Sequence, residues 1–177
     1  MVCLPGGYGT GHRMASKTPP RFEQIIGQHL KRLGHTLATA ESCSGGLIAH
    51  RITNVPGSSD YFLGGVVAYS NKAKAALLRV PKAELATYGA VSEQVARHMA
   101  EGARSRFGAD YGIGVTGIAG PQGGTPEKPV GLVYIAVAAP EATAVLRNDF
   151  RGTRIAIKEQ TAQRALKMLI EVLKRQE

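Results

Sequence analysis

The sequence has little cysteine, no tryptophan and no long apolar run. Its 177 residues include two cysteines, Cys3 and Cys43, which are too few for a disulfide framework and have no cysteine or histidine partners at metal-ligand spacing. No apolar run approaches the roughly 18 residues that a membrane-spanning helix needs. The first twenty residues lack the apolar centre of a secretory signal. We therefore expect a cytoplasmic protein that has no membrane partner and no metal site.

Positive charge is in excess, but it is not concentrated. The formal net charge is +9, and clustered Lys and Arg residues would suggest a nucleic-acid partner because they neutralise phosphates. The basic residues are instead scattered, and no basic run is interleaved with aromatic residues. Attraction of a small anionic substrate, or solubility alone, explains the charge as well. We expect no nucleic-acid partner and keep a nucleic-acid binder as an alternative to test.

The composition predicts one domain behind a short leader. Residues 1–20 combine glycine, proline and charge without periodicity, which is typical of a flexible segment. Residues 21–177 contain no internal repeat and no linker, and they are numerous enough to bury one sizeable core. We expect a flexible leader at 1–20 and a single domain at 21–177.

Helical and strand patterns alternate along that domain. Apolar spacing predicts helices at 21–33, 47–53, 70–78 and 92–107, and a terminal helix from about residue 155. Apolar runs predict strands at 35–40, 65–69, 110–117 and 132–139, and 143–150 is a further candidate. Residues 81–94 are predicted as a connector, in which Ser92 and Glu93 begin the next helix. Wholly apolar strands between helices indicate an α/β sandwich with a largely parallel sheet, because both faces of such strands are covered.

In such a sheet, ligands bind where loops leave the carboxyl ends of the strands, and three loops fit that position. The first, "ESCSGG", can project the hydroxyl of Ser42 or Ser44, while amides near Gly45 and Gly46 point to the same place and stabilise an oxyanion. The alternative for either serine is a helix N-cap. Cys43 is a rival nucleophile, although a buried structural thiol is the commoner fate of a cysteine there.

A nucleophilic serine needs a base, and lysine is the best candidate. The histidines lie in the leader or in and beside helical stretches. In the second loop, "YSNKAK", Tyr69 ends a strand and Lys74 lies one helical turn further, so both can face the crevice of the serine. A lysine has an ordinary pKa of roughly 10.4, which burial and the nearby Lys72 would have to lower. The alternative is a solvated surface lysine.

The third loop, "TGIAGPQGG", carries the glycines Gly117, Gly120, Gly123 and Gly124 after a strand. Such a loop exposes backbone amides that can hold a phosphate. It is not a P-loop, because no Gly-Lys-Ser/Thr follows. The stretch "GIGVTG" matches Gly-x-Gly-x-x-Gly, but a helix precedes it and no acid stands about twenty residues later, so we reject a dinucleotide site.

With these loops in order, the chain from about residue 21 to its end resembles the CinA C-terminal domain family, whose stand-alone members are nicotinamide-nucleotide amidases. The resemblance is carried by "TAESCSGG", "VPGSSDYFLGGVVAYSNKAK", "YGAVSEQVA" and "GVTGIAGPQGGTPEKPVGLVYIA". It implies a three-layer α/β/α domain with a mixed sheet. It also implies hydrolysis of nicotinamide mononucleotide to nicotinic acid mononucleotide and ammonia, with Ser42 as the nucleophile and Tyr69 and Lys74 as its partners.

The same resemblance suggests where the substrate binds. We expect the nucleotide to contact Ser44, Gly45, Gly46, Asn71, Thr116, Gly117, Gly120, Gly123, Gly124 and Arg154. Two departures from the family are Ser44, where a threonine is common, and Gly152-Thr153-Arg154, where "GDR" is common.

Three further expectations and one alternative accompany this reading. We expect no cofactor and a homo-oligomer. Because the leader does not resemble the larger N-terminal domain of fused CinA proteins, we expect no activity of that domain. The alternative to an enzyme is a nucleotide-binding regulatory module of the same fold.

Overall fold

The computed structural model describes residues 21–176, and the predicted flexible leader, residues 1–20, lies outside them. The helices are α1 Phe22–Leu33, α2 Leu47–Thr53, α3 Asn71–Leu78, α4 Lys82–Tyr88, α5 Glu93–Phe107 and α6 Arg154–Leu173, with short 3-10 turns at Ser58–Asp60 and Lys174–Gln176. The strands are β1 Leu37–Glu41, β2 Phe62–Val67, β3 Tyr111–Gly117, β4 Leu132–Ala138 and β5 Thr143–Asp149.

Two of the predicted segments differ from the structure. Residues 81–94, predicted as a connector, contain the helix α4, in which Leu85 is the buried residue. One buried side chain produces no apolar periodicity, so the sequence pattern does not reveal the helix. The strand β2 begins at Phe62. The prediction placed its start at residue 65 because Gly64 and Gly65 interrupt the apolar pattern of the strand.

The sheet has the strand order β2-β1-β3-β4-β5. Pairing is parallel between β2, β1 and β3 and antiparallel between β3 and β4 and between β4 and β5. The expected mixed sheet is therefore confirmed, and parallel pairing is confined to one half of it. The other half is antiparallel because β3, β4 and β5 follow one another without an intervening helix, and parallel neighbours need a crossover connection.

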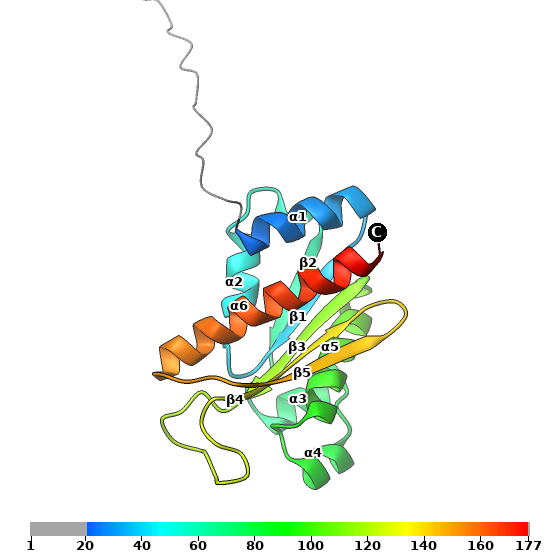
Figure 1. Ribbon diagram of the computed structural model, residues 1–177. Helices are drawn as coiled ribbons and strands as arrows, with labels where there is room; N and C mark the ends of the chain where they lie inside the picture. The colour runs from blue at the N-terminus through cyan, green and yellow to red at the C-terminus, as the bar shows by residue number, and fades with distance from the viewer. Residues whose placement is uncertain (1–20, 177) are drawn as a thin grey trace, which may run out of the picture.

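Helices cover both faces of this sheet, as the predicted three-layer sandwich requires (Figure 1). Helices α1, α2 and α6 pack together on one face, and α5 packs on the other with α3 and α4 beside it. The α5 layer lies close to the sheet because β3 presents Gly112 and Gly114 to the backbone of Ala96 and Ala100. A Cβ at either glycine would overlap that backbone, so the sequence of β3 sets the spacing between two layers.

The parallel half of the sheet brings three loops to one end, as predicted. The loops after β1, β2 and β3 all leave the carboxyl ends of neighbouring strands. The Ser42 amide donates to the carbonyl oxygen of Val115 at 3.0 Å, and the Ala68 amide donates to that of Glu41 at 2.8 Å. These bonds extend the strand ladder by one residue and hold the first two loops side by side.

Candidate active site

The side chains of Ser42 and Lys74 meet at the carboxyl end of β1. The Lys74 amine donates to Ser42 Oγ at 2.9 Å and to the carbonyl oxygen of Ala68 at 2.9 Å. Ser42 is 8% exposed and Lys74 is 2% exposed. Lys74 reaches this point from the first turn of α3, which Ser70 caps by accepting from the Ala73 amide at 3.1 Å. The structure therefore brings the predicted nucleophile and the predicted base into direct contact.

Burial gives this lysine unusual chemistry. Loss of solvent around the ammonium lowers the pKa of Lys74 below its ordinary value. Among the described residues, no carboxylate accepts a hydrogen bond from the amine. No hydrogen bond to a negative charge therefore raises the pKa of Lys74 back toward its ordinary value. The neighbouring Lys72, which the sequence suggested as a second cause, is exposed and does not contribute to the shift. Burial lowers the pKa without it.

The turn that carries Ser42 needs its glycines for backbone reasons. Gly45 and Gly46 have φ values of 64° and 92°, a region that favours glycine. The Gly45 amide donates to the carbonyl oxygen of Ser42 at 3.1 Å, and the Gly46 amide donates to Glu41 Oε2 at 3.0 Å. Both amides are thus engaged inside the turn. An oxyanion would have to displace these partners, and the oxyanion role of the two amides stays a prediction.

Cys43 also lines the cavity beside Ser42 and Lys74, but its thiol is poorly suited to act as a nucleophile. Cys43 is 5% exposed and packs in the apolar core between the sheet and the α1, α2 and α6 layer. Burial raises the pKa of its thiol to about 12, so the thiolate that would attack a substrate is scarce at neutral pH. The structure favours Ser42 over its rival in the same loop.

Tyr69 lies at the rim of the site rather than against the amine. Its side chain is 62% exposed, and its hydroxyl accepts a hydrogen bond from Arg154 Nη2 at 2.6 Å. Arg154 also donates from Nη1 to the carbonyl oxygen of Gly120 at 2.7 Å. The guanidinium therefore links the second loop to the third. Thr153, where the family commonly has an acid, caps α6 by accepting from the Ala156 amide at 3.3 Å.

A cavity of about 270 Å³ lies beside the serine–lysine pair. Its lining includes nine of the predicted residues: Ser42, Tyr69, Asn71, Lys74, Thr116, Gly117, Gly120, Gly123 and Arg154. Ser44, Gly45, Gly46 and Gly124 do not line it, so the structure places these four predicted contacts away from the cavity wall. Ser44 is fully buried, and its Oγ has no hydrogen-bond partner within the described part of the chain.

A larger cavity of about 730 Å³ lies between α1, α2 and α6. Among residues 21–176, no serine, threonine, cysteine or lysine lines it. Its buried Glu23 is paired with Arg51 at 2.9 Å, and that guanidinium holds the pKa of the carboxyl low although burial opposes this. The larger volume therefore lacks a nucleophile, and the smaller cavity is the candidate site.

Several residues of the site were missed by sequence reasoning. Glu41 caps the turn with its carboxylate, and an acid at the end of a strand, four residues before a glycine pair and a helix, was a usable signal. Ala68 contributes a backbone carbonyl, which leaves no trace in the sequence. Ala90 and Val91, from the segment between α4 and α5, form part of the cavity wall. Gln122 lies on the same wall from the glycine loop.

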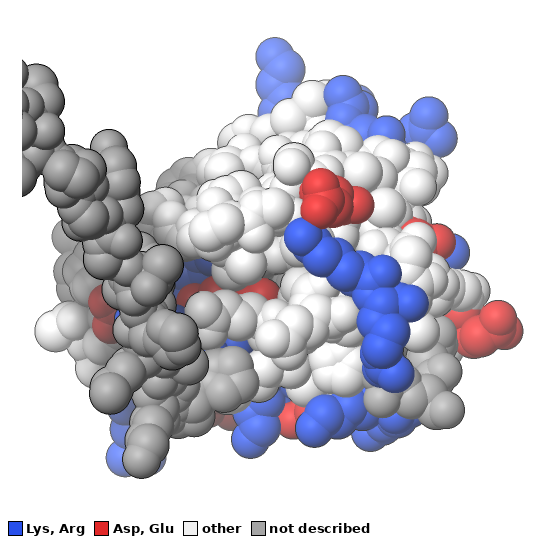
Figure 2. Space-filling model, turned by 90° about the horizontal axis from the view of Figure 1, so that it is seen from above, with Lys and Arg blue, Asp and Glu red and all other residues white. Residues whose placement is uncertain are grey.

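Charge is scattered on one visible face of the protein. On the face seen in Figure 2, Lys and Arg side chains are spread among uncharged and acidic ones. None of the helices in the described part of the chain has the length and hydrophobicity needed to cross a bilayer.

The fold and the site define a three-layer α/β domain with a buried serine–lysine pair at the carboxyl end of its parallel strands. Residues 20–173 match the family model described as the CinA C-terminal domain. The chain belongs to the CinA C-terminal domain family. The CinA-like protein of Acidobacterium capsulatum is 54% identical over 148 residues, which are 84% of this chain and 36% of that protein. The CinA-like protein of Koribacter versatilis is 52% identical over 148 residues, again 84% of this chain and 36% of the relative.

Solved structures show the same fold over nearly their whole length. The competence/damage inducible protein CihA from Agrobacterium tumefaciens has a TM-score of 0.83 and 41% identity, with 90% of this chain and 99% of that chain covered. The CinA superfamily protein from Escherichia coli has a TM-score of 0.81 and 32% identity, with coverages of 85% and 90%. By contrast, the chain spans 36% of the length of the two curated relatives above.

Proposed function

We propose that the protein is an amidohydrolase that converts nicotinamide mononucleotide to nicotinic acid mononucleotide and ammonia. The observation that carries this proposal is the buried contact of 2.9 Å between Lys74 Nζ and Ser42 Oγ. A lysine with a lowered pKa has a neutral fraction that can take a hydroxyl proton near neutral pH. The resemblance to stand-alone members of the family supplies the choice of substrate.

The reaction proceeds by covalent catalysis. Neutral Lys74 takes the proton of Ser42, and Oγ attacks the carboxamide carbon. The tetrahedral intermediate then breaks its C–N bond while the Lys74 ammonium returns a proton to the departing nitrogen, which leaves as ammonia. Water attacks the acyl-enzyme with Lys74 again as the base, which releases the carboxylate product and restores Ser42. The carbonyl of Ala68 keeps the amine aimed at Oγ throughout.

The cavity suits an anionic nucleotide. Its volume of about 270 Å³ lies just below the range of roughly 300–1,000 Å³ that is common for small-ligand sites, so part of a nucleotide would extend beyond the rim. Arg154 at that rim carries a positive charge that attracts a phosphate group. The hydroxyl of Tyr69 accepts from Arg154, and its own proton is available to a substrate oxygen. This chemistry requires neither a metal nor an organic cofactor.

Ammonia release tests reaction and substrate together. We expect release from nicotinamide mononucleotide in preference to nicotinamide, nicotinamide riboside and NAD. Binding of the mononucleotide without release would instead favour the nucleotide-binding regulatory module. Steeply salt-dependent retention on DNA would favour a nucleic-acid binder. The expected homo-oligomer stays a prediction that sedimentation velocity tests.

Two neighbouring substitutions test the nucleophile. Ser42→Ala removes the attacking oxygen, and we expect turnover to fall by at least about 10³-fold, as for other covalent catalysts. Cys43→Ala removes only a buried thiol, and we expect turnover within about tenfold of the wild type. Retained turnover in Ser42→Ala, together with loss in Cys43→Ala, would transfer the role to the cysteine.

A further inference from the structure

We propose that Lys128 is a positioning residue that fixes one wall of the active-site cavity. It holds the loop between β3 and β4, residues 118–131, against the segment between α4 and α5, residues 88–92. The inference rests on the proposed function, because the cavity it shapes is the one assigned to the nucleotide. Lys128 does not line that cavity, so its effect passes through the residues that do.

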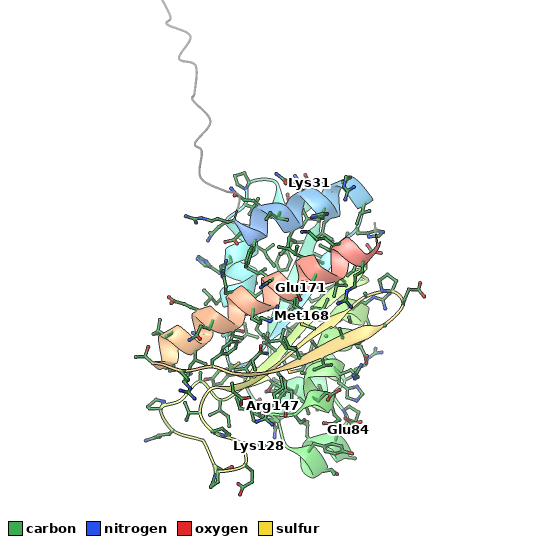
Figure 3. All side chains as sticks on the ribbon, viewed as in Figure 1. Lys31, Glu84, Lys128, Arg147, Met168 and Glu171 are labelled. Carbon is green, nitrogen blue, oxygen red and sulfur yellow. The ribbon has the colours of Figure 1, made fainter. Side chains whose placement is uncertain are left out.

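The contact is short and two-pronged. Lys128 Nζ donates to the carbonyl oxygen of Tyr88 at 2.6 Å and to that of Val91 at 2.8 Å. In Figure 3, Lys128 lies on the side of the long loop that faces α4. A Cβ at Gly89 would lie 3.3 Å from Nζ, closer than most such contacts, and Gly89 has a φ of 73°. Gly89, one of the two residues between the acceptors, thus leaves room for the amine.

A local turn directs the lysine toward these acceptors. The Thr125 amide donates to the carbonyl oxygen of Lys128 at 2.9 Å. The Lys128 amide donates in return to Thr125 Oγ1 at 3.0 Å. These reciprocal bonds close residues 125–128 into a tight turn, so the backbone of Lys128 is fixed before its side chain extends. The long side chain therefore loses less conformational freedom in making the contact than it would from an open loop.

Four consecutive carbonyls of the 88–92 segment accept hydrogen bonds from side chains. Ser92 Oγ donates to Gly89 at 3.1 Å, and Thr116 Oγ1 donates to Ala90 at 2.7 Å. Lys128 supplies the bonds to Tyr88 and Val91. Two of these four bonds therefore come from one amine. Bonds from a charged donor are the stronger kind.

The consequence for catalysis is selective. Ala90 and Val91 line the cavity from the 88–92 segment, and Gly120, Gln122 and Gly123 line it from the loop that carries Lys128. Ser42 and Lys74 belong to other elements and contact each other independently of Lys128. Loss of the Lys128 contacts should therefore weaken substrate binding more than the chemical step.

The test compares Lys128→Met with Lys167→Met in the full chain. Both variants remove one positive charge, and Lys167 is an exposed residue of α6, so the control corrects for attraction of an anionic substrate. Hydrogen exchange should become about tenfold faster in residues 88–92 and 118–125 of Lys128→Met, as expected when bonds from a charged donor are lost. Exchange in residues 42–46 should stay unchanged in both variants.

Kinetics supply the second readout. We expect Lys128→Met to raise KM for nicotinamide mononucleotide about tenfold and to leave kcat within about threefold, relative to Lys167→Met. Lys128→Arg can also donate to two carbonyls, so its KM should lie close to the wild-type value. The pH profile of kcat should not move, because the environment of Lys74 is untouched.

The outcomes separate this inference from the proposed function. Unchanged exchange in Lys128→Met overturns the positioning role, and so does faster exchange with an unchanged KM, which would mark a contact without functional effect. A fall in kcat at constant KM also overturns it. If the wild type releases no ammonia, the proposed function fails. The role of Lys128 is then decided by two other measurements, hydrogen exchange and the dissociation constant of nicotinamide mononucleotide.

Discussion

Replacement of Glu41 by glutamine tests whether one buried carboxylate builds the turn that carries Ser42. Glu41 is 1% exposed. Its carboxylate accepts from the amides of Gly46 at 3.0 Å, Ile48 at 3.1 Å and Ala49 at 2.8 Å. These amides open α2, where N–H groups have no partner within the helix. The N-cap residue, Gly46, has no side chain to satisfy them, so Glu41 does so from the strand.

The geometry sets the expected loss of stability. In its less costly orientation, glutamine keeps the oxygen that serves Gly46 and Ile48 and turns its NH2 toward the Ala49 amide. One charge-assisted bond, worth about 1.5–3 kcal/mol, is then lost, and the other two become weaker neutral bonds. The lower desolvation cost of an uncharged amide offsets part of this. We expect Glu41→Gln to lower the free energy of unfolding by about 2–4 kcal/mol.

Urea denaturation followed by circular dichroism measures this loss. The matched control is Glu141→Gln, because Glu141 is exposed on the turn between β4 and β5, and we expect it to remain within about 0.5 kcal/mol of the wild type. A loss of 2–4 kcal/mol would be a large share of the roughly 5–15 kcal/mol that stabilises a typical domain. A Glu41→Gln protein as stable as the control would refute the capping role.

Three further predictions concern the site and the sheet. Burial lowers the folded-state pKa of Lys74 below its ordinary value of 10.5, so the unfolded chain binds more protons between these two values. The free energy of unfolding of the wild type should therefore rise with pH relative to that of Lys74→Met. The value of kcat/KM should also rise as the pH passes the lowered pKa. A difference in unfolding free energy between the two proteins that does not change with pH would contradict the shift. A double-mutant cycle of Tyr69→Phe and Arg154→Met, read as kcat/KM, should give a coupling of about 0.5–1.5 kcal/mol, whereas additive effects would exclude a functional bond. Gly114→Ala should cost about 1–3 kcal/mol in urea unfolding because its Cβ would overlap α5; an unchanged midpoint would show that the helix can move away.

Much of the fold was predictable because its signals are local. Apolar spacing predicted α1, α2, α3, α5 and α6 close to their observed bounds. The helix α4 was missed because burial of Leu85 alone leaves no period to detect. The apolar pattern of the strands also did not specify which half of the sheet is antiparallel. An apolar strand that is covered on both faces has the same pattern in either direction.

The candidate site was also predictable only in part. The residue types that carry the proposed chemistry, Ser42 and Lys74, were chosen from their places after two strands, and the structure joins them across 32 residues of chain. The sequence does not show that other groups of the turn already accept the amide protons of Gly45 and Gly46, and their oxyanion role stays a prediction. The partnership of Tyr69 with Arg154, rather than with Lys74, likewise depends on where α6 begins.

The order of the helices and strands other than α4, the loops at the carboxyl ends of the parallel strands and the side chains available there all follow from local sequence patterns. Three features become visible only when the elements are packed together: the amine of Lys74 is buried against Ser42, Glu41 closes the turn, and Lys128 joins two segments of the cavity wall. The reason is physical: periodicity is a property of neighbours along the chain, whereas burial, pKa and hydrogen bonding between elements depend on how the layers pack.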